Sequence, residues 1–82
     1  MSNLNSNIWE IGKVCCEKVY FRKYADAEVG RIRYLKSENV YSATIIEFDQ
    51  EMIMETTKFF DIFLEAILWI DAMVEIIFEI PV

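Results

Sequence analysis

Histidine is absent from this chain of 82 residues. Without an imidazole side chain, the sequence lacks the most common general acid–base group, the base of Ser–His and Cys–His nucleophile pairs, and the usual ligands of catalytic zinc. We therefore expect no catalytic residues and predict that the protein is not an enzyme.

Glycine and proline are scarce, with Gly12, Gly30 and Pro81 as the only examples. Neither isolated glycine belongs to a glycine-rich loop of the kind that holds the phosphates of dinucleotides or nucleoside triphosphates. This absence argues against the common nucleotide-dependent classes, so we expect no cofactor. So few turn-forming residues also predict that the helices and strands are long.

The two cysteines, Cys15 and Cys16, are adjacent in the sequence. A disulfide between neighbours is strained, so we expect two free thiols in a reducing compartment. A structural zinc site needs four ligands, which this chain supplies only if two copies contribute their thiolates together. We expect no metal site.

A targeting segment and a membrane span are also missing. Residues 1–7 are polar and lack the charged and apolar regions of a signal peptide, and we expect them to fray. The longest apolar run of the last third, Ala66 to Ile70, is far shorter than the roughly 20 residues of a membrane helix. We therefore expect a cytoplasmic protein that does not bind membranes.

What the chain does contain is a large apolar fraction, 55% of its residues. Soluble domains usually have roughly 45–50%. A chain of this length forms one domain over residues 1–82 and buries only roughly 60–65% of the surface of its unfolded form. Part of the apolar excess should remain exposed and mark an interface, so we predict a homo-oligomer, in the simplest case a dimer, or an obligate complex. A compact monomer with a rich core is the alternative.

Negative charge is concentrated in the last third. Residues 1–48 contain seven bases and six acids, whereas residues 49–82 contain one base and eight acids, which gives the chain its net charge of −6. An acidic surface attracts a basic partner over long range and disfavours nonspecific adhesion to nucleic acid and anionic membranes. We therefore predict a protein partner with a basic surface.

The first part of the fold is predicted from three segments. Apolar residues at helical spacing predict a helix from Ile8 to about Tyr20, with a strand from Val19 to Tyr24 as the alternative for its end. The β-branched and aromatic runs of residues 29–35 and 40–48 flank a polar loop of residues 36–39. This pattern predicts a β-hairpin.

The last third predicts a helix followed by a strand. Asp49 is suited to cap a helix that runs to about Ile70, with its acids on a narrow polar stripe. From Val74 to Val82 apolar residues alternate, which favours a C-terminal strand over a helix that continues to Glu79. The predicted fold is α+β: an N-terminal helix, an antiparallel β-hairpin or small sheet, a long acidic amphipathic helix and a C-terminal strand.

The polar stripe supplies the candidate site. Carboxylates four residues apart repel each other on a helix; a solvated face is the common explanation for them, and a face that meets a basic partner is the functional one. We expect partner binding by residues of this stripe and one apolar anchor: Glu51, Glu55, Asp61, Glu65 and Trp69. The predicted function is a small acidic protein-interaction module that inhibits or regulates its partner, in the manner of an immunity protein or a phage-encoded inhibitor of a host factor.

Residues 18–36 support an alternative function. In this stretch basic side chains are interleaved with the rings of Tyr20, Phe21, Tyr24 and Tyr34. Positive charge beside aromatic rings is the combination that binds single-stranded nucleic acid. Because the chain is acidic overall, nucleic-acid binding is the less favoured of the two predictions.

Overall fold

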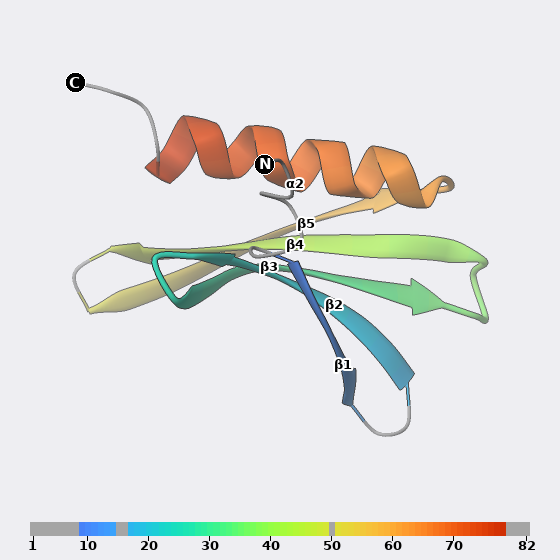
Figure 1. The fold of residues 1–82 in the computed structure, drawn as a ribbon. Helices are drawn as coiled ribbons and strands as arrows, with labels where there is room; N and C mark the ends of the chain where they lie inside the picture. Colours follow the sequence, from blue (N-terminus) through green and yellow to red (C-terminus); the bar gives the residue numbers. More distant parts are fainter. Residues whose placement is uncertain (1–8, 15–16, 50, 79–82) are drawn as a thin grey trace, which may run out of the picture.

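The computed structural model describes residues 9–14, 17–49 and 51–78. Its centre is a five-stranded antiparallel sheet in which strands that follow each other in sequence are also neighbours in space. The strands are β1 (Trp9–Val14), β2 (Glu17–Tyr24), β3 (Ala27–Leu35), β4 (Val40–Asp49) and β5 (Met52–Phe60). The helix α2 (Phe63–Phe78) follows β5 and lies across one face of the sheet (Figure 1).

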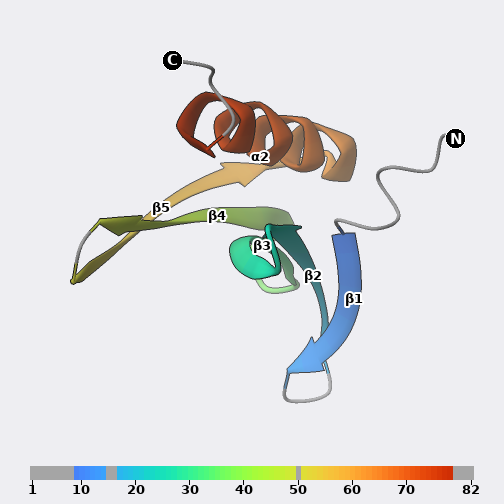
Figure 2. The same cartoon turned by 60° about the vertical axis from the view of Figure 1, so that its left-hand side comes forward.

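The sheet has two different faces, because successive side chains of a strand point to opposite sides. We call the side beneath α2 the helix face and the other side the open face. The register places Tyr20, Ile32, Ala43 and Lys58 in one row on the helix face. The β1–β2 hairpin curls away from α2 (Figure 2), so the helix packs mainly on the middle of the sheet and leaves much of both edges uncovered.

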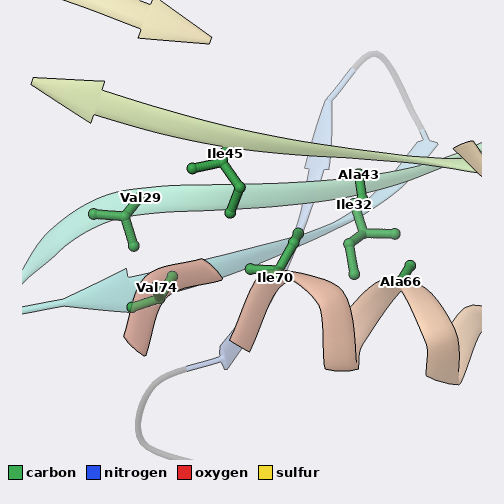
Figure 3. Close-up of a cluster of buried hydrophobic side chains, with 7 residues drawn as sticks. All are labelled: Val29, Ile32, Ala43, Ile45, Ala66, Ile70 and Val74. Carbon is green, nitrogen blue, oxygen red and sulfur yellow. The ribbon is translucent and has the colours of Figure 1, made fainter. Parts of the chain in front are cut away.

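The core lies between α2 and the helix face. Ala66, Ile70 and Val74 follow each other at intervals of four residues, so they share one side of the helix. All three are buried, and they face the central strands (Figure 3). The sheet side of this core consists of Val29, Ile32, Ala43 and Ile45.

Gly30 allows α2 to approach the sheet closely. A Cβ atom at this position would come within 2.8 Å of Cγ2 of Ile70 and 3.2 Å of Cβ of Arg22. A larger residue would therefore displace the helix or the neighbouring strand. The register between β2 and β3 shifts between Arg22 and Lys23, a bulge of the kind that increases the local twist of a sheet.

The predicted β-hairpin is confirmed: β3 and β4 pair along the predicted segments, and residues 36–39 form the turn. In this turn the backbone N–H groups of Glu38 and Asn39 donate to the carbonyl of Leu35, at 3.2 and 2.7 Å. Asn39 has a φ of 58°, a left-handed conformation in which asparagine is enriched.

The predicted N-terminal helix is wrong, because its described residues form the hairpin of β1 and β2. The apolar spacing that suggested a helix has another cause, since Ile11 lies on the helix face of β1 and Val19 on the open face of β2. Gly12, unfavourable in a helix, lies against the ring of Phe21, and a Cβ there would come within 3.0 Å of Cε2. The alternative of a strand from Val19 to Tyr24 is confirmed. Cys15, Cys16 and residues 1–7 lie outside the described residues.

The predicted helix from Asp49 to Ile70 is also wrong over its first half. Asp49 is the last residue of β4 rather than a helix cap, and β5 pairs with β4 over its whole length. The helix begins only at Phe63, after a bend at Asp61 and Ile62. Its first turn is closed by the N–H groups of Glu65 and Ala66, which donate to the carbonyl of Ile62 at 3.1 and 3.3 Å.

The predicted C-terminal strand is wrong as well, since α2 continues to Phe78. Burial in this part follows the helical period: Val74 is buried, Ile77 and Phe78 are half-buried, and Ile76 is exposed. The alternation of apolar residues arises because apolar side chains occur on nearly every side of the helix. The segment of residues 79–82 lies outside the described part of the chain.

Candidate protein-interaction surface

The side of α2 that points away from the sheet carries a row of apolar residues. Leu64, Leu68 and Ile76 are each more than half exposed, and with the exposed Ala72 they occupy successive positions four residues apart. Such residues form a continuous row along a helix. We call these four residues the outer face of α2. An exposed apolar row on the side of a helix opposite its buried side marks a candidate contact surface.

Acidic residues border this row. Asp61 precedes the helix, and Glu65 and Glu75 lie on it; all three side chains are exposed. Among the described residues, none of these three acids forms an ion pair. The helix sequence Phe63–Phe78 contains no basic residue, so the negative charge around the outer face is not compensated locally.

The five predicted site residues do not form one stripe. Asp61 and Glu65 lie together at the start of α2, whereas Glu51 lies in the β4–β5 turn and Glu55 on the open face of β5. The stripe depended on a single helix over residues 49–70, and the strand β5 divides it into two separate groups. All four carboxylates are exposed.

Trp69, the predicted apolar anchor, belongs to the edge of the core. Its ring lies 5.8 Å from that of Phe60, measured between ring centroids, and it is half-buried. The exposed residue of this part of the helix is its neighbour Leu68, of which 58% is accessible. The sequence did not distinguish the two, because both lie in the same apolar run.

Charge pairing changes the interpretation of the basic stretch of residues 18–36. Three of its bases pair with acids on the sheet: Lys23 with Glu10 at 3.2 Å, Arg31 with Glu28 at 3.6 Å and Arg33 with Glu17 at 3.2 Å. A fourth base, Arg22, is buried and pairs with α2. The stretch therefore offers little uncompensated positive charge for a phosphate backbone.

Two of the rings in this stretch lie beneath α2. Tyr20 contacts Phe63 with 4.7 Å between ring centroids, and Tyr24 contacts Phe78 at 5.5 Å. The hydroxyl of Tyr24 also donates to the carbonyl of Phe78 at 3.2 Å. These rings hold the helix on the sheet, so they do not form a platform on which bases could stack.

A partly buried polar cluster that the sequence did not reveal joins β1, β2 and α2. Nε of Arg22 lies 2.7 Å from Oδ1 of Asp71, and only 5% of Arg22 is exposed. The indole N–H of Trp9 donates to the same oxygen at 3.1 Å, and Nη1 of Arg22 donates to the carbonyl of Lys23 at 2.6 Å. The only sequence signal was an acid, Asp71, within an apolar run. We interpret the cluster as structural, since it fixes the rotation of α2 on the sheet.

A second group of exposed apolar residues lies along β5 and the end of β4. Phe48, Ile53 and Phe59 lie on the open face, and Met52 and Met54 on the helix face. The end of β4 and the start of β5 extend beyond the helix (Figure 2). At the other end of β5, a shallow hollow of about 540 Å³ is lined by Leu35, Glu38, Val40 and Phe59.

Other site types are not found in the described residues. No group of three or more Cys, Asp or Glu side chains is arranged to hold a metal ion in residues 9–14, 17–49 and 51–78. Within the same ranges no helix has the length and apolar character needed to cross a membrane. The chain matches no protein-family model, no curated protein and no solved structure.

Proposed function

We propose that the protein is a non-enzymatic interaction module that binds another protein through the outer face of α2. The observation that carries this proposal is the exposed row of Leu64, Leu68 and Ile76. An apolar row on the solvent side of a helix is the feature that helix-in-groove complexes use. Exposed apolar patches on small proteins commonly mark such interfaces.

The partner that fits this surface has an apolar groove with a basic rim. Asp61, Glu65 and Glu75 border the row and lack ion-pair partners within the described part of the chain. Complementary charge raises the association rate and selects among partners, while the buried apolar anchors supply most of the affinity. A module of this kind acts by occupying a surface of its partner, so we expect it to inhibit or regulate that partner.

The test compares two variants that carry the same change on different surfaces. Leu68→Asp places a charge in the middle of the outer face. Ile11→Asp places one on β1, at a residue that is even more exposed. Each variant and the wild-type protein are immobilised, exposed to cell extract, and the captured proteins are identified by mass spectrometry.

The proposal expects a protein that is captured by the wild type and by Ile11→Asp but lost with Leu68→Asp. With that partner purified, Leu68→Asp should weaken binding at least about tenfold, since a charge would be buried in an apolar contact. Glu65→Lys should mainly slow association and reduce its dependence on salt. Equal capture by Leu68→Asp and Ile11→Asp would contradict the assignment of the binding surface to α2.

A further inference from the structure

Strand β5 is an open edge of the sheet. It pairs with β4 on one side, and in the described part of the chain no strand pairs with its other side. Its nine residues contain no proline or glycine, and only Glu55 and Lys58 are charged. Natural edge strands are usually protected from pairing with another chain by shortness, prolines, bulges or inward charges; of these devices β5 has one charge on its helix face, Lys58. The opposite edge, β1, is shorter and contains Gly12.

The open face of β5 carries an exposed apolar residue near each end. Ile53, of which 65% is accessible, lies beside Phe48 of β4 at one end. Phe59, of which 58% is accessible, lies at the other end and borders the hollow lined by Leu35 and Val40. Within residues 9–14, 17–49 and 51–78, both ends remain uncovered.

We propose that two copies of this chain associate through β5, paired antiparallel about a two-fold axis at Thr56, to form one continuous sheet. In this arrangement Ile53 of each copy lies opposite Phe59 of the other. The two-fold axis therefore produces this apolar contact twice. Each contact extends into a row across the interface, formed by Phe48, Ile53 and the second copy's Phe59. Such self-complementarity is what an interface between identical copies requires.

The other positions of β5 agree with this register. On the helix face, Met52 lies opposite Phe60 of the second copy. Met54 lies opposite Lys58, whose Nζ is 5.5 Å from the centroid of the Phe60 ring in its own chain. Cross-strand pairs of this kind are the units that stabilise antiparallel sheets. No two like charges are directly opposite.

Neighbouring registers fit less well. A shift that centres the pairing on Glu55 places the two copies of this carboxylate opposite each other, which is destabilising. A shift that centres it on Thr57 leaves Met52 and Ile53 beyond the end of the second strand. Pairing about Thr56 is the register that uses all nine residues of β5. It also keeps both copies of α2 on one side of the joined sheet, with their outer faces free.

The mass in solution and a charge swap test this interface. Light scattering at micromolar concentration should give roughly twice the 9.7 kDa mass of the chain. Ile53→Asp and Phe59→Lys should each weaken the dimer at least about tenfold, because each places an unpaired charge opposite an apolar residue. Mixing the two variants should restore a dimer, since the introduced charges then face each other. The control Ile11→Asp should remain dimeric.

Cysteine cross-linking tests the register even if a charged variant fails to fold. In a background with Cys15→Ser and Cys16→Ser, Thr56→Cys should form a disulfide-linked dimer, because directly opposite residues have Cα atoms about 4.5–5.5 Å apart. Thr57→Cys is the matched control. In this register residue 57 of one copy is displaced along the strand by roughly 7 Å from residue 57 of the other copy, so the two cysteines should not cross-link.

A monomeric wild-type protein at micromolar concentration would overturn the proposal. So would dimerisation that is unaffected by both charged variants, a mixture of folded variants that stays monomeric, or equal cross-linking at the two threonine positions. None of these results bears on partner binding through Leu68, because that surface lies on α2 and not on β5.

Discussion

The ion pair between Arg22 and Asp71 should be one of the main contacts that hold α2 on the sheet. Asp71→Asn is the perturbation that isolates it, since asparagine keeps an oxygen that accepts the N–H of Trp9 and loses the charge that faces Arg22. The pair is asymmetric: 6% of the Arg22 side chain is exposed and 31% of that of Asp71.

The expected loss follows from this asymmetry. Removing one member of a fully buried ion pair costs about 3–5 kcal/mol. Solvent reaches Asp71, and Arg22 keeps its hydrogen bond to the Lys23 carbonyl, so we expect a smaller loss of about 2 kcal/mol in the free energy of unfolding. For a domain of this size that loss corresponds to a decrease in Tm of about 8–16 °C.

Urea denaturation followed by circular dichroism measures this loss. The comparison is best made in the Ile53→Asp background, so that unfolding does not depend on protein concentration through dimerisation. Arg22→Met and the double variant with Asp71→Asn complete a double-mutant cycle, which should give a coupling of at least about 1 kcal/mol. A loss below about 0.5 kcal/mol, the value of an exposed pair, or additive effects in the cycle, would refute the reasoning.

Two further predictions concern the backbone. Gly30→Ala should destabilise the protein by about 1–3 kcal/mol, because the new methyl group would lie 2.8 Å from Cγ2 of Ile70; Gly12→Ala, whose Cβ meets only the edge of a flexible ring, is the control and should cost less in the same denaturation experiment. Ala25→Gly should stabilise the protein by up to about 1 kcal/mol, because Ala25 has a φ of 52°, a conformation that is strained for alanine and not for glycine. A decrease in Tm on Ala25→Gly would contradict this explanation.

The sequence predicted the β3–β4 hairpin correctly because each of these two strands buries apolar side chains beneath α2. Ile32 and Ile45 are buried beneath α2 while Arg31 and Arg33 point to the open face, so the side chains show the period of a strand. The polar residues of the turn gave a second, independent signal. Where one face of a strand is buried and the other is not, its period becomes visible in the sequence.

Strand β5 was mistaken for a helix because neither of its faces is buried. All of its residues except Phe60 are exposed, so neither face imposes an apolar alternation. The spacing of Glu51, Glu55 and Glu65 then matched a helix by coincidence. The end of α2 was mistaken for a strand for a different reason. Apolar residues such as Leu68 and Ile76 occur on the exposed side of the helix as well as in the core, which hides the helical period.

The candidate surface was predictable only in part. Uncompensated acids beside apolar residues in the last third were visible in the sequence, and Asp61 and Glu65 do lie beside the outer face of α2. Their grouping with Glu51 and Glu55 required a helix that does not exist. Which apolar residue is exposed, Leu68 or Trp69, depends on the rotation of α2, and the contact of Arg22 with Asp71 helps to fix that rotation from 49 residues away.

The apolar excess of the sequence has a simple architectural cause. In the part of the chain that the structure describes, the 16-residue helix α2 covers only part of one face of a five-stranded sheet, and exposed apolar residues remain at β5 and on α2. The two proposals assign each of these areas a different role. Pairing through β5 would cover Ile53 and Phe59 and leave the outer face of α2 exposed in both copies. Because both helices would then lie on the same side of the joined sheet, the dimer would present two identical binding surfaces, and a partner with two matching sites would bind with an avidity that neither copy has alone.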